Sequence, residues 1–294
     1  MPQRINRAIE LLESGQPIYY AGGHSGHVLT YEQGQQDATI WADYINVGME
    51  HGAFDMAGLD DYLRGLIAGG PTTSGHRTPT VIVEVPVDGS NESIIRYNAW
   101  QFRQLLARGV HGVLLCQAES ADAVRAFVES CRYPIHKLGV GRGLGIGTRG
   151  RGSEPSAAPV WGLSPAEYME CADPWPLNPH GELLLGVKIE SPEGVSNVEQ
   201  ILRVPGLGFA EMGPGDLSLS LGYKDIPRDP YPPEMQEARR RVFGACQANG
   251  IAFLESCTPD NVVKKIDEGV RVIAGQREET AKIGRAHSQR TMPV

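Results

Sequence analysis

Eight short apolar segments with strand character recur along the chain, and helical segments separate most of them. Short strands that alternate with longer helices are typical of βαβ units, in which the strands run parallel. Eight such units predict a (β/α)₈ barrel, and an open doubly wound sheet is the second possibility. No GxGxxG lies between the first strand and the first helix, which weakens the dinucleotide-binding version of that sheet. The predicted strands cover residues 17–23, 43–50, 80–86, 112–118, 183–190, 208–214, 251–256 and 270–276.

Length and charge narrow the class of protein further. The 294 residues suit one domain over 1–294, with an N-terminal helix at 3–14 and a C-terminal helical tail at 277–294. The net charge of −8 argues against nucleic acid or an anionic membrane as a partner. No segment reaches the roughly 20 apolar residues of a membrane span, and the amphipathic start is not a signal peptide. Five cysteines without CxxC or CxxH spacing fit reduced thiols, so we expect a cytoplasmic protein.

Two predicted strands lead directly to carboxylates. The segment LLLGVKIE ends at Glu190, and GFAEMGP is followed by Gly215 and Asp216. Mg²⁺ and Mn²⁺ prefer oxygen ligands, and one or two carboxylates with substrate oxygens can complete such a site. We therefore predict that Glu190 and Asp216 bind a divalent metal. Strand-end carboxylates that cap the next helix are the alternative interpretation.

Further polar residues lie at the ends of the predicted strands, where a barrel carries its chemistry. Buried charges are costly unless they are paired or bound to metal, so this concentration of charge itself indicates a site. His51 is the candidate general base, because a histidine titrates at about 6.5. His24 and His27 follow the first strand and could line the same rim. The whole set comprises Glu50, His51, Glu84, Gln117, Lys188, Glu190 and Asp216.

Lys188 precedes Glu190 by two positions, so both side chains share one face of the strand. If Glu190 points at the metal, Lys188 points into the barrel. A lysine there is either a Schiff-base nucleophile or the charge partner of a carboxylate.

Three segments fall outside the strand and helix pattern, namely 71–79, 87–97 and 140–165. The last is rich in glycine, serine and proline, and long loops in compact barrels are usually functional or disordered. It could cradle an anionic substrate, or serve as a solvated lid or a contact between subunits. Its arginines are Arg142, Arg149 and Arg151.

Several of these segments resemble the HpcH/HpaI family of class II pyruvate (2-oxo acid) aldolases. The similar stretches are YINVGMEHG, RQLLARGVHGVLLCQAESADAVRAFVESCRYP, GVGRGLG and VKIESPEGVSNVEQILRVPGLGFAEMGPGDLSLSLGY. They lie between about residues 40 and 275, and the pairing of IE with GPxDLS is specific to this family.

The resemblance implies a (β/α)₈ barrel of the phosphoenolpyruvate/pyruvate-binding type. It also implies a homo-oligomer, a hexamer or trimer of dimers, often with an exchanged C-terminal helix. Glu190 and Asp216 would hold Mg²⁺, Mn²⁺ or Co²⁺, which a 2-oxo acid such as pyruvate chelates. The metal would act as a Lewis acid when the C3–C4 bond of a 4-hydroxy-2-oxo acid breaks. His51 would handle the proton of the aldol hydroxyl, Glu50 would position a water on the metal, and backbone N–H groups near Gly215 would hold the carboxylate.

Three positions depart from the family pattern. The arginine that stabilises the enolate is Glu84 here, the glutamine before the metal glutamate is Lys188, and the aspartate that orients the histidine is Gly48. We expect Glu84 and Lys188 to face each other, with Lys188 taking the cationic role. Arg96 is a second candidate for the missing guanidinium. The residues Asp55 or Asn46 could orient His51.

We therefore predict a metal-dependent aldolase that cleaves or forms a 4-hydroxy-2-oxo acid, with a 2-oxo acid and an aldehyde as its small-molecule partners. The catalytic candidates are His51, Glu50, Lys188, Arg96 and Glu84, and the substrate-binding candidates are Gly215, Asp216 and Gln117. An acyl-CoA-linked lyase or a decarboxylase on the same scaffold, or a non-catalytic oligomeric binding protein, remain the alternatives.

Overall fold

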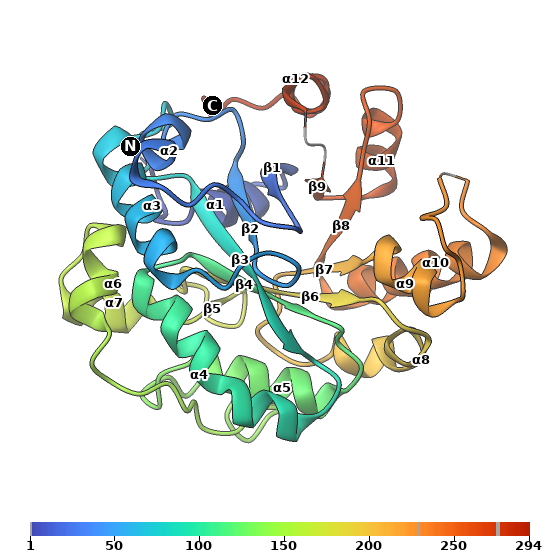
Figure 1. Cartoon of the computed structure of the whole chain (residues 1–294), viewed down its shortest axis with the longest axis horizontal. Coiled ribbons are helices and arrows are strands. Elements are labelled where there is room, and N and C mark those ends of the chain that lie inside the picture. The colour runs from blue at the N-terminus through green and yellow to red at the C-terminus, as the bar shows by residue number, and fades with distance from the viewer. Residues whose placement is uncertain (1, 229, 275–276) are drawn as a thin grey trace.

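The strands form a closed parallel barrel, as predicted (Figure 1). The computed structural model describes residues 2–228, 230–274 and 277–294. Within this part of the chain, neighbouring strands pair in parallel, and a pairing between β4 and β6 closes the ring of eight. The barrel strands are β1 (Ile18–Gly23), β2 (Tyr44–Gly48), β3 (Thr80–Asp88), β4 (Gly112–Cys116), β6 (Leu183–Ile189), β7 (Phe209–Met212), β8 (Ala252–Ser256) and β9 (Val272–Ala274). The end of the predicted eighth strand, 275–276, lies outside the described residues.

Helices surround the barrel, and their apolar faces pack on the outward-facing strand residues. Outside the ring, the two-residue strand β5 (Pro174–Trp175) extends the sheet beside β6 and is too short for hydrophobic periodicity to reveal. The helices are α1 (Arg7–Glu13), α2 (Tyr31–Asp37), α3 (Met56–Gly69), α4 (Glu92–Arg108), α5 (Ala121–Cys131), α6 (Glu154–Trp161), α7 (Pro165–Cys171), α8 (Pro192–Ile201), α9 (Pro214–Ser220), α10 (Pro233–Asn249), α11 (Val262–Glu268) and α12 (Glu278–His287). In the described part of the chain, no helix is both long and apolar enough to cross a membrane.

Two of the expected loops contain helix. The expected loop 87–97 includes the first two turns of α4, because the Asn91 side chain accepts the backbone N–H of Ile94 and caps the helix there. The expected loop 140–165 contains α6, which has a proline in its first turn and ends at Gly162 in the left-handed conformation. Sequence periodicity missed both starts because the helix-forming signals there are a side-chain cap for α4 and an early proline for α6, rather than apolar repeats.

The barrel interior has an apolar half and a polar half. Side chains along a strand alternate between the inside and the outside of a barrel. Toward the N-terminal ends of the strands, the inward positions are apolar and pack with α1, which covers that end. Phe209 fills this space so closely that a Cβ at Gly186 would lie 2.4 Å from its ring. Toward the C-terminal ends, the inward positions are Asn46, Glu84, Cys116, Lys188 and Glu211.

A buried ion cluster joins the two ends of the chain at the apolar end of the barrel. Asp43 is fully buried and lies 3.3 Å from Arg7, the first residue of α1, and 3.2 Å from Arg285 on α12. Arg290 also donates to Asp43, at 2.8 Å. Burial alone would raise the pKa of Asp43, but the hydrogen bond and charge of Arg290 outweigh it and hold that pKa below its usual value.

Replacing Asp43 with Asn should destabilise the fold by about 3–5 kcal/mol, because three guanidinium groups lose their buried counter-charge. Chemical denaturation measures this change. Asp60→Asn is the matched control, since Asp60 is partly exposed and pairs with Arg64 and Arg108 only at 3.5 Å. The control should cost less than about 1 kcal/mol, and equal costs for the two variants would contradict the role given to Asp43.

Candidate metal and acid–base site

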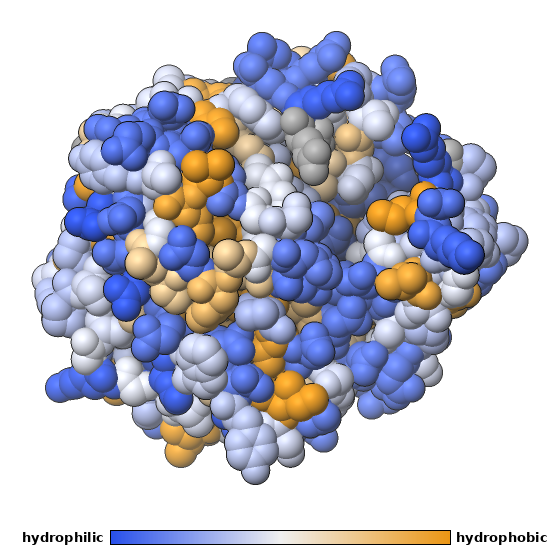
Figure 2. All heavy atoms as spheres, viewed as in Figure 1, coloured by the Kyte–Doolittle hydropathy of each residue, from blue (hydrophilic) through white to orange (hydrophobic). Residues whose placement is uncertain are grey.

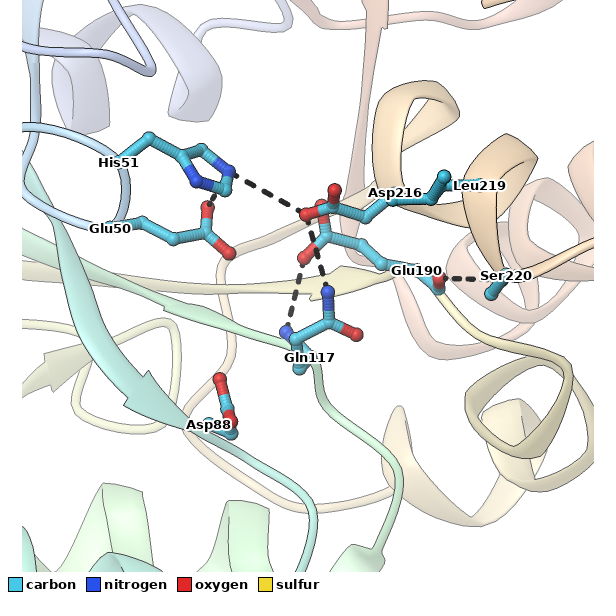
Figure 3. A pocket seen from close by; sticks show the side chains of 8 residues that line it. All are labelled: Glu50, His51, Asp88, Gln117, Glu190, Asp216, Leu219 and Ser220. Carbon is cyan, nitrogen blue, oxygen red and sulfur yellow. Dashed lines mark hydrogen bonds and ion pairs between the residues drawn. The ribbon is translucent and has the colours of Figure 1, made fainter. Parts of the chain in front are cut away.

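The C-terminal ends of five barrel strands surround a cavity of about 410 Å³. Figure 3 shows side chains from separate strand ends pointing toward one another across it. Figure 2 shows mainly hydrophilic side chains over β6 and β7 in the middle of the face drawn. The cavity is lined by Glu50, His51, Asp88, Gln117, Glu190, Asp216, Leu219 and Ser220.

Lys188 bridges two of the carboxylates. Its Nζ donates to Glu50 Oε2 at 2.8 Å and lies 3.2 Å from Glu190 Oε1. Burial raises the pKa of Glu190 to about 8, and the charge of Lys188 only partly opposes this. One ammonium group therefore does not balance the buried negative charge at this end of the barrel.

Gln117 forms hydrogen bonds to both predicted metal ligands, Glu190 and Asp216. Its backbone N–H donates to Glu190 Oε2 at 3.1 Å, and its side-chain amide donates to Asp216 Oδ2 at 3.3 Å. Its φ of 48° lies in the left-handed region, which costs a non-glycine residue on the order of 1 kcal/mol. Glutamine at this position points to a functional constraint, because glycine would adopt the same backbone conformation without strain.

Gly213 makes room for Glu190. A Cβ at this position would lie 2.3 Å from Glu190 Oε1, far inside van der Waals contact. The turn between β7 and α9 therefore approaches the carboxylate closely only because residue 213 has no side chain. The same turn leads to Gly215 and Asp216 in the first turn of α9.

His51 stands at the open side of the cavity. Its Nε2 lies 3.5 Å from Glu50 Oε2 and 3.6 Å from Asp216 Oδ2, and its side chain is 50% exposed. The ring can thus meet a substrate while it remains next to two carboxylates. Neither residue expected to orient it does so: Asp55 caps α3 through the N–H of Gly58, and Asn46 donates to Glu84.

The oxygen donors of the site suit a hard divalent cation. Ligand atoms of Glu50, His51 and Asp216 lie within 4.8 Å of one another, and those of Glu50, Cys116 and Glu190 form a second such group. Glu50 belongs to both groups, so the structure places it between the two predicted ligands, Glu190 and Asp216. Three carboxylates with one neighbouring ammonium leave negative charge that a divalent cation would neutralise.

The expected pair between Glu84 and Lys188 is not formed. Glu84 instead accepts from His24 Nδ1 at 2.7 Å and from the Asn46 amide at 2.9 Å. Burial alone would raise the pKa of Glu84, but the His24 hydrogen bond and the charge of Lys188 lower it below its ordinary value. The hydrogen bond to Glu84 raises the pKa of His24. His24 is thus the direct cationic partner of Glu84, and Lys188 acts on it only at longer range.

Other candidates lie away from the cavity. Arg96 hydrogen-bonds Glu92 and Glu129 on the outer side of the barrel, so it does not supply the missing guanidinium. His27 contacts Asp37 and Tyr62 behind the rim.

Some residues of the site were not expected from the sequence. Asp88 lines the cavity because β3 continues past an irregularity after Glu84, where the loop 87–97 was expected. Burial, with the nearby charge of Glu50, raises the pKa of Asp88. Glu211 is buried beside Lys188 in the strand register, and its Oε2 has no hydrogen-bond partner among the described residues. The alternating pattern of β7 could have identified Glu211, because it places residue 211 on the inner face.

Glu211 should make stability depend on pH. Burial raises its pKa to about 7 from an ordinary 4.5, so between these values the folded state holds a proton that the unfolded state releases. The free energy of unfolding should therefore fall as pH rises from 4.5 to about 7, by on the order of 3 kcal/mol. Denaturation in EDTA at several pH values measures it. The Glu211→Gln variant should show a smaller decline in the free energy of unfolding with pH, whereas the control Glu32→Gln, at an exposed position, should show the native decline. Parallel pH curves for the two variants would contradict the role given to Glu211.

Comparison with known proteins gives the family. The description HpcH/HpaI aldolase/citrate lyase matches residues 76–275. Hydroxypyruvate/pyruvate aldolase from Delftia acidovorans is 36% identical over 174 residues, 58% of this chain and 56% of that protein. The 2-keto-3-deoxy-L-rhamnonate aldolase of Klebsiella pneumoniae is 32% identical over 181 residues, 58% of this chain and 57% of that protein.

These matches span little more than half the length of the curated relatives. A solved structure covers more: a HpcH/HpaI aldolase/citrate lyase family protein from Burkholderia cenocepacia J2315 has a TM-score of 0.70 at 22% identity, over 96% of both chains. That likeness supports the barrel fold, and the family description covers most of the chain. The chain therefore belongs to the HpcH/HpaI aldolase/citrate lyase family.

Proposed function

We propose that this protein is a metal-dependent aldolase that cleaves or forms a 4-hydroxy-2-oxo acid, with pyruvate or a related 2-oxo acid and an aldehyde as the other species. The convergence of three carboxylates and His51 on one cavity supports this proposal most directly. The aldolase names of two relatives agree with it.

The metal would be held by Glu190 and Asp216, with Glu50 beside both. A hard cation such as Mg²⁺ or Mn²⁺, or Co²⁺, suits these oxygen donors. When bound, it supplies Lewis-acid polarisation of the 2-oxo acid carbonyl. Gln117 and Gly213 keep Glu190 in position through the N–H bond and the close backbone approach already described.

His51 is proposed as the general base. In the cleavage direction it takes the proton of the C4 hydroxyl while the C3–C4 bond breaks, and the electron pair of that bond passes to C3. The aldehyde leaves, and the proton that His51 accepted is returned to C3, which restores the neutral imidazole. The half-exposed ring of His51 reaches an incoming aldehyde, and the neighbouring Glu50 and Asp216 stabilise the imidazolium.

Lys188 is proposed to supply the positive charge that the family arginine carries. It is a buried ammonium in contact with Glu50 and Glu190, which line the cavity, and Glu84 has His24 as its own partner. Burial disfavours the ammonium, but Cys116 and the carboxylates Glu190 and Glu211 more than compensate and raise the pKa of Lys188. A permanently charged Lys188 suits electrostatic stabilisation of an oxyanion and does not suit a Schiff-base nucleophile, which must lose its proton.

The 2-oxo acid carboxylate is proposed to meet the first turn of α9, at Gly215 and Asp216, opposite Gln117. The cysteines are free, which supports a cytoplasmic setting, and we propose a homo-oligomer on the family resemblance. The alternatives with acyl-CoA or decarboxylation share the same metal residues, and no observation in the described residues favours them.

Incubation with Mg²⁺ or Mn²⁺, pyruvate and a panel of aldehydes should give aldol products, detected by mass spectrometry. EDTA and Glu190→Ala should each abolish product formation, because each removes the cation from the site. Glu193→Ala, at an exposed position in the following helix, is the matched control and should keep activity. Product from Glu190→Ala would refute the proposed site, and no product from the native protein with any aldehyde would favour a binding protein.

Lys188→Gln separates two roles of the lysine. If Lys188 stabilises the developing oxyanion, kcat should fall by about 10²-fold or more. Metal affinity should rise at the same time, because the ammonium no longer occupies the space between Glu50 and Glu190. Calorimetric metal titration and steady-state kinetics measure the two effects. A change in metal affinity alone would show that Lys188 is only a charge partner.

A further inference from the structure

Four arginines surround a second polar cavity at the opposite end of the barrel. This cavity measures about 420 Å³ and lies between the last turns of α4 and the segment 149–156. The C-terminal end of α4 leads into the N-terminal end of β4, whereas the site described above is built at the C-terminal ends of the strands. Its lining includes Arg103, Arg108, Arg149, Arg151, Ser153 and Ser156.

Arg149 carries a buried charge with no counter-charge. It is 1% exposed, lies over the Tyr133 ring at 4.4 Å, and donates through Nη2 to the Tyr168 hydroxyl at 2.8 Å. Its Nε and Nη1 have no hydrogen-bond partner in the described residues. Burying an unpaired charge costs several kcal/mol, so the site favours a bound anion.

The arginines around it are also short of negative partners. Across residues 2–228, 230–274 and 277–294, neither Arg103 nor Arg151 forms an ion pair, and Arg108 approaches Asp60 only at 3.5 Å. The nearby Glu154 uses one carboxylate oxygen to accept the N–H of Gly152 and forms no ion pair with Arg149. Such a concentration of positive charge contrasts with the net charge of −8.

The backbone leaves the cavity open to a ligand. A Cβ at Gly150 or at Gly152 would meet no atom within 4 Å, and the φ of Gly152 is +114°. The segment can therefore pass beside a ligand without side chains in the way. The Ser156 hydroxyl donates to the carbonyls of Ala107 and Ser153, so it joins this segment to the end of α4.

We propose that this arginine cluster, Arg103, Arg108, Arg149 and Arg151, binds a phosphate-bearing anion. Planar guanidinium groups match the oxygens of phosphate in bidentate fashion, and a doubly charged anion suits several unpaired arginines better than a single carboxylate does. The cavity volume fits inorganic phosphate, pyrophosphate or a small phosphomonoester. The site is separate from the proposed aldolase site and does not depend on it. The arginines of the segment 140–165 thus divide: Arg149 and Arg151 belong to this cluster, and Arg142 does not.

The test uses the full chain in EDTA, so that a metal at the other site cannot bind the anions. Melting temperature is followed against phosphate, pyrophosphate and glucose 6-phosphate, each at ionic strength matched with KCl. At least one anion should raise the melting temperature saturably, as expected for a ligand that binds only the folded state. The three arms identify whether free phosphate, a diphosphate or a phosphomonoester is preferred.

The Arg103→Ala/Arg151→Ala variant should bind at least tenfold more weakly, and both positions are exposed, so the variant should fold. Arg142→Ala is the matched control from the same segment and should bind as the native protein does. No anion-specific shift, or equal shifts in all three proteins, would overturn the proposal. Light scattering measures the oligomeric mass of the native protein and of the double variant. If the variant changes in mass and the native protein binds none of the anions, the arginines belong to a subunit contact and the proposal is overturned as well.

Discussion

The bridge from Lys188 to Glu50 and Glu190 is the interaction on which the site depends. It joins the ends of β2 and β6, which lie far apart in the sequence, through two contacts of 2.8 and 3.2 Å. Without the ammonium, two buried carboxylates would face each other in a low-dielectric interior, and one would take up a proton. The bridge opposes this uptake of a proton only in part, since the pKa of Glu190 is still raised to about 8, and the ammonium lies in the region where a cation is expected.

The departures from the family pattern are accommodated locally. An acidic side chain at position 84 would be an uncompensated buried charge, but His24 and Asn46 satisfy it. In the proposal above, Lys188 supplies the positive charge from β6, which is separated from β3 by β4 alone. Under that proposal, the substrate oxyanion would meet an ammonium in place of a guanidinium. An ammonium is a compact point charge without the planar bidentate geometry of arginine, which alters the shape of substrate that the site can accept.

Most of the fold could be predicted from the sequence, because burial on both faces makes each parallel strand a continuous apolar run. Seven of the eight barrel strands lie within the predicted segments, and β3 extends two residues beyond its segment, to Asp88. The starts of α4 and α6 could not be located in the same way. They depend on the Asn91 cap and on an early proline, which are single-residue signals outside any apolar repeat. Asp88 was missed for a related reason, since β3 continues beyond an irregularity that periodicity does not reveal.

The sequence by itself determined the barrel, the strand-end positions of Glu50, His51, Glu190 and Asp216, and the three departures from the family pattern. The barrel and the strand-end positions follow from local periodicity, and the departures follow from setting this sequence beside the motif of the family that it resembles. Only the tertiary structure decided which charges meet: Lys188 with Glu50 and Glu190, Glu84 with His24, and Arg149 with no carboxylate. The physical reason is that pairing of buried charges depends on distances of a few ångströms between strands and helices remote in sequence, and strand spacing alone does not fix the reach of a side chain across a barrel.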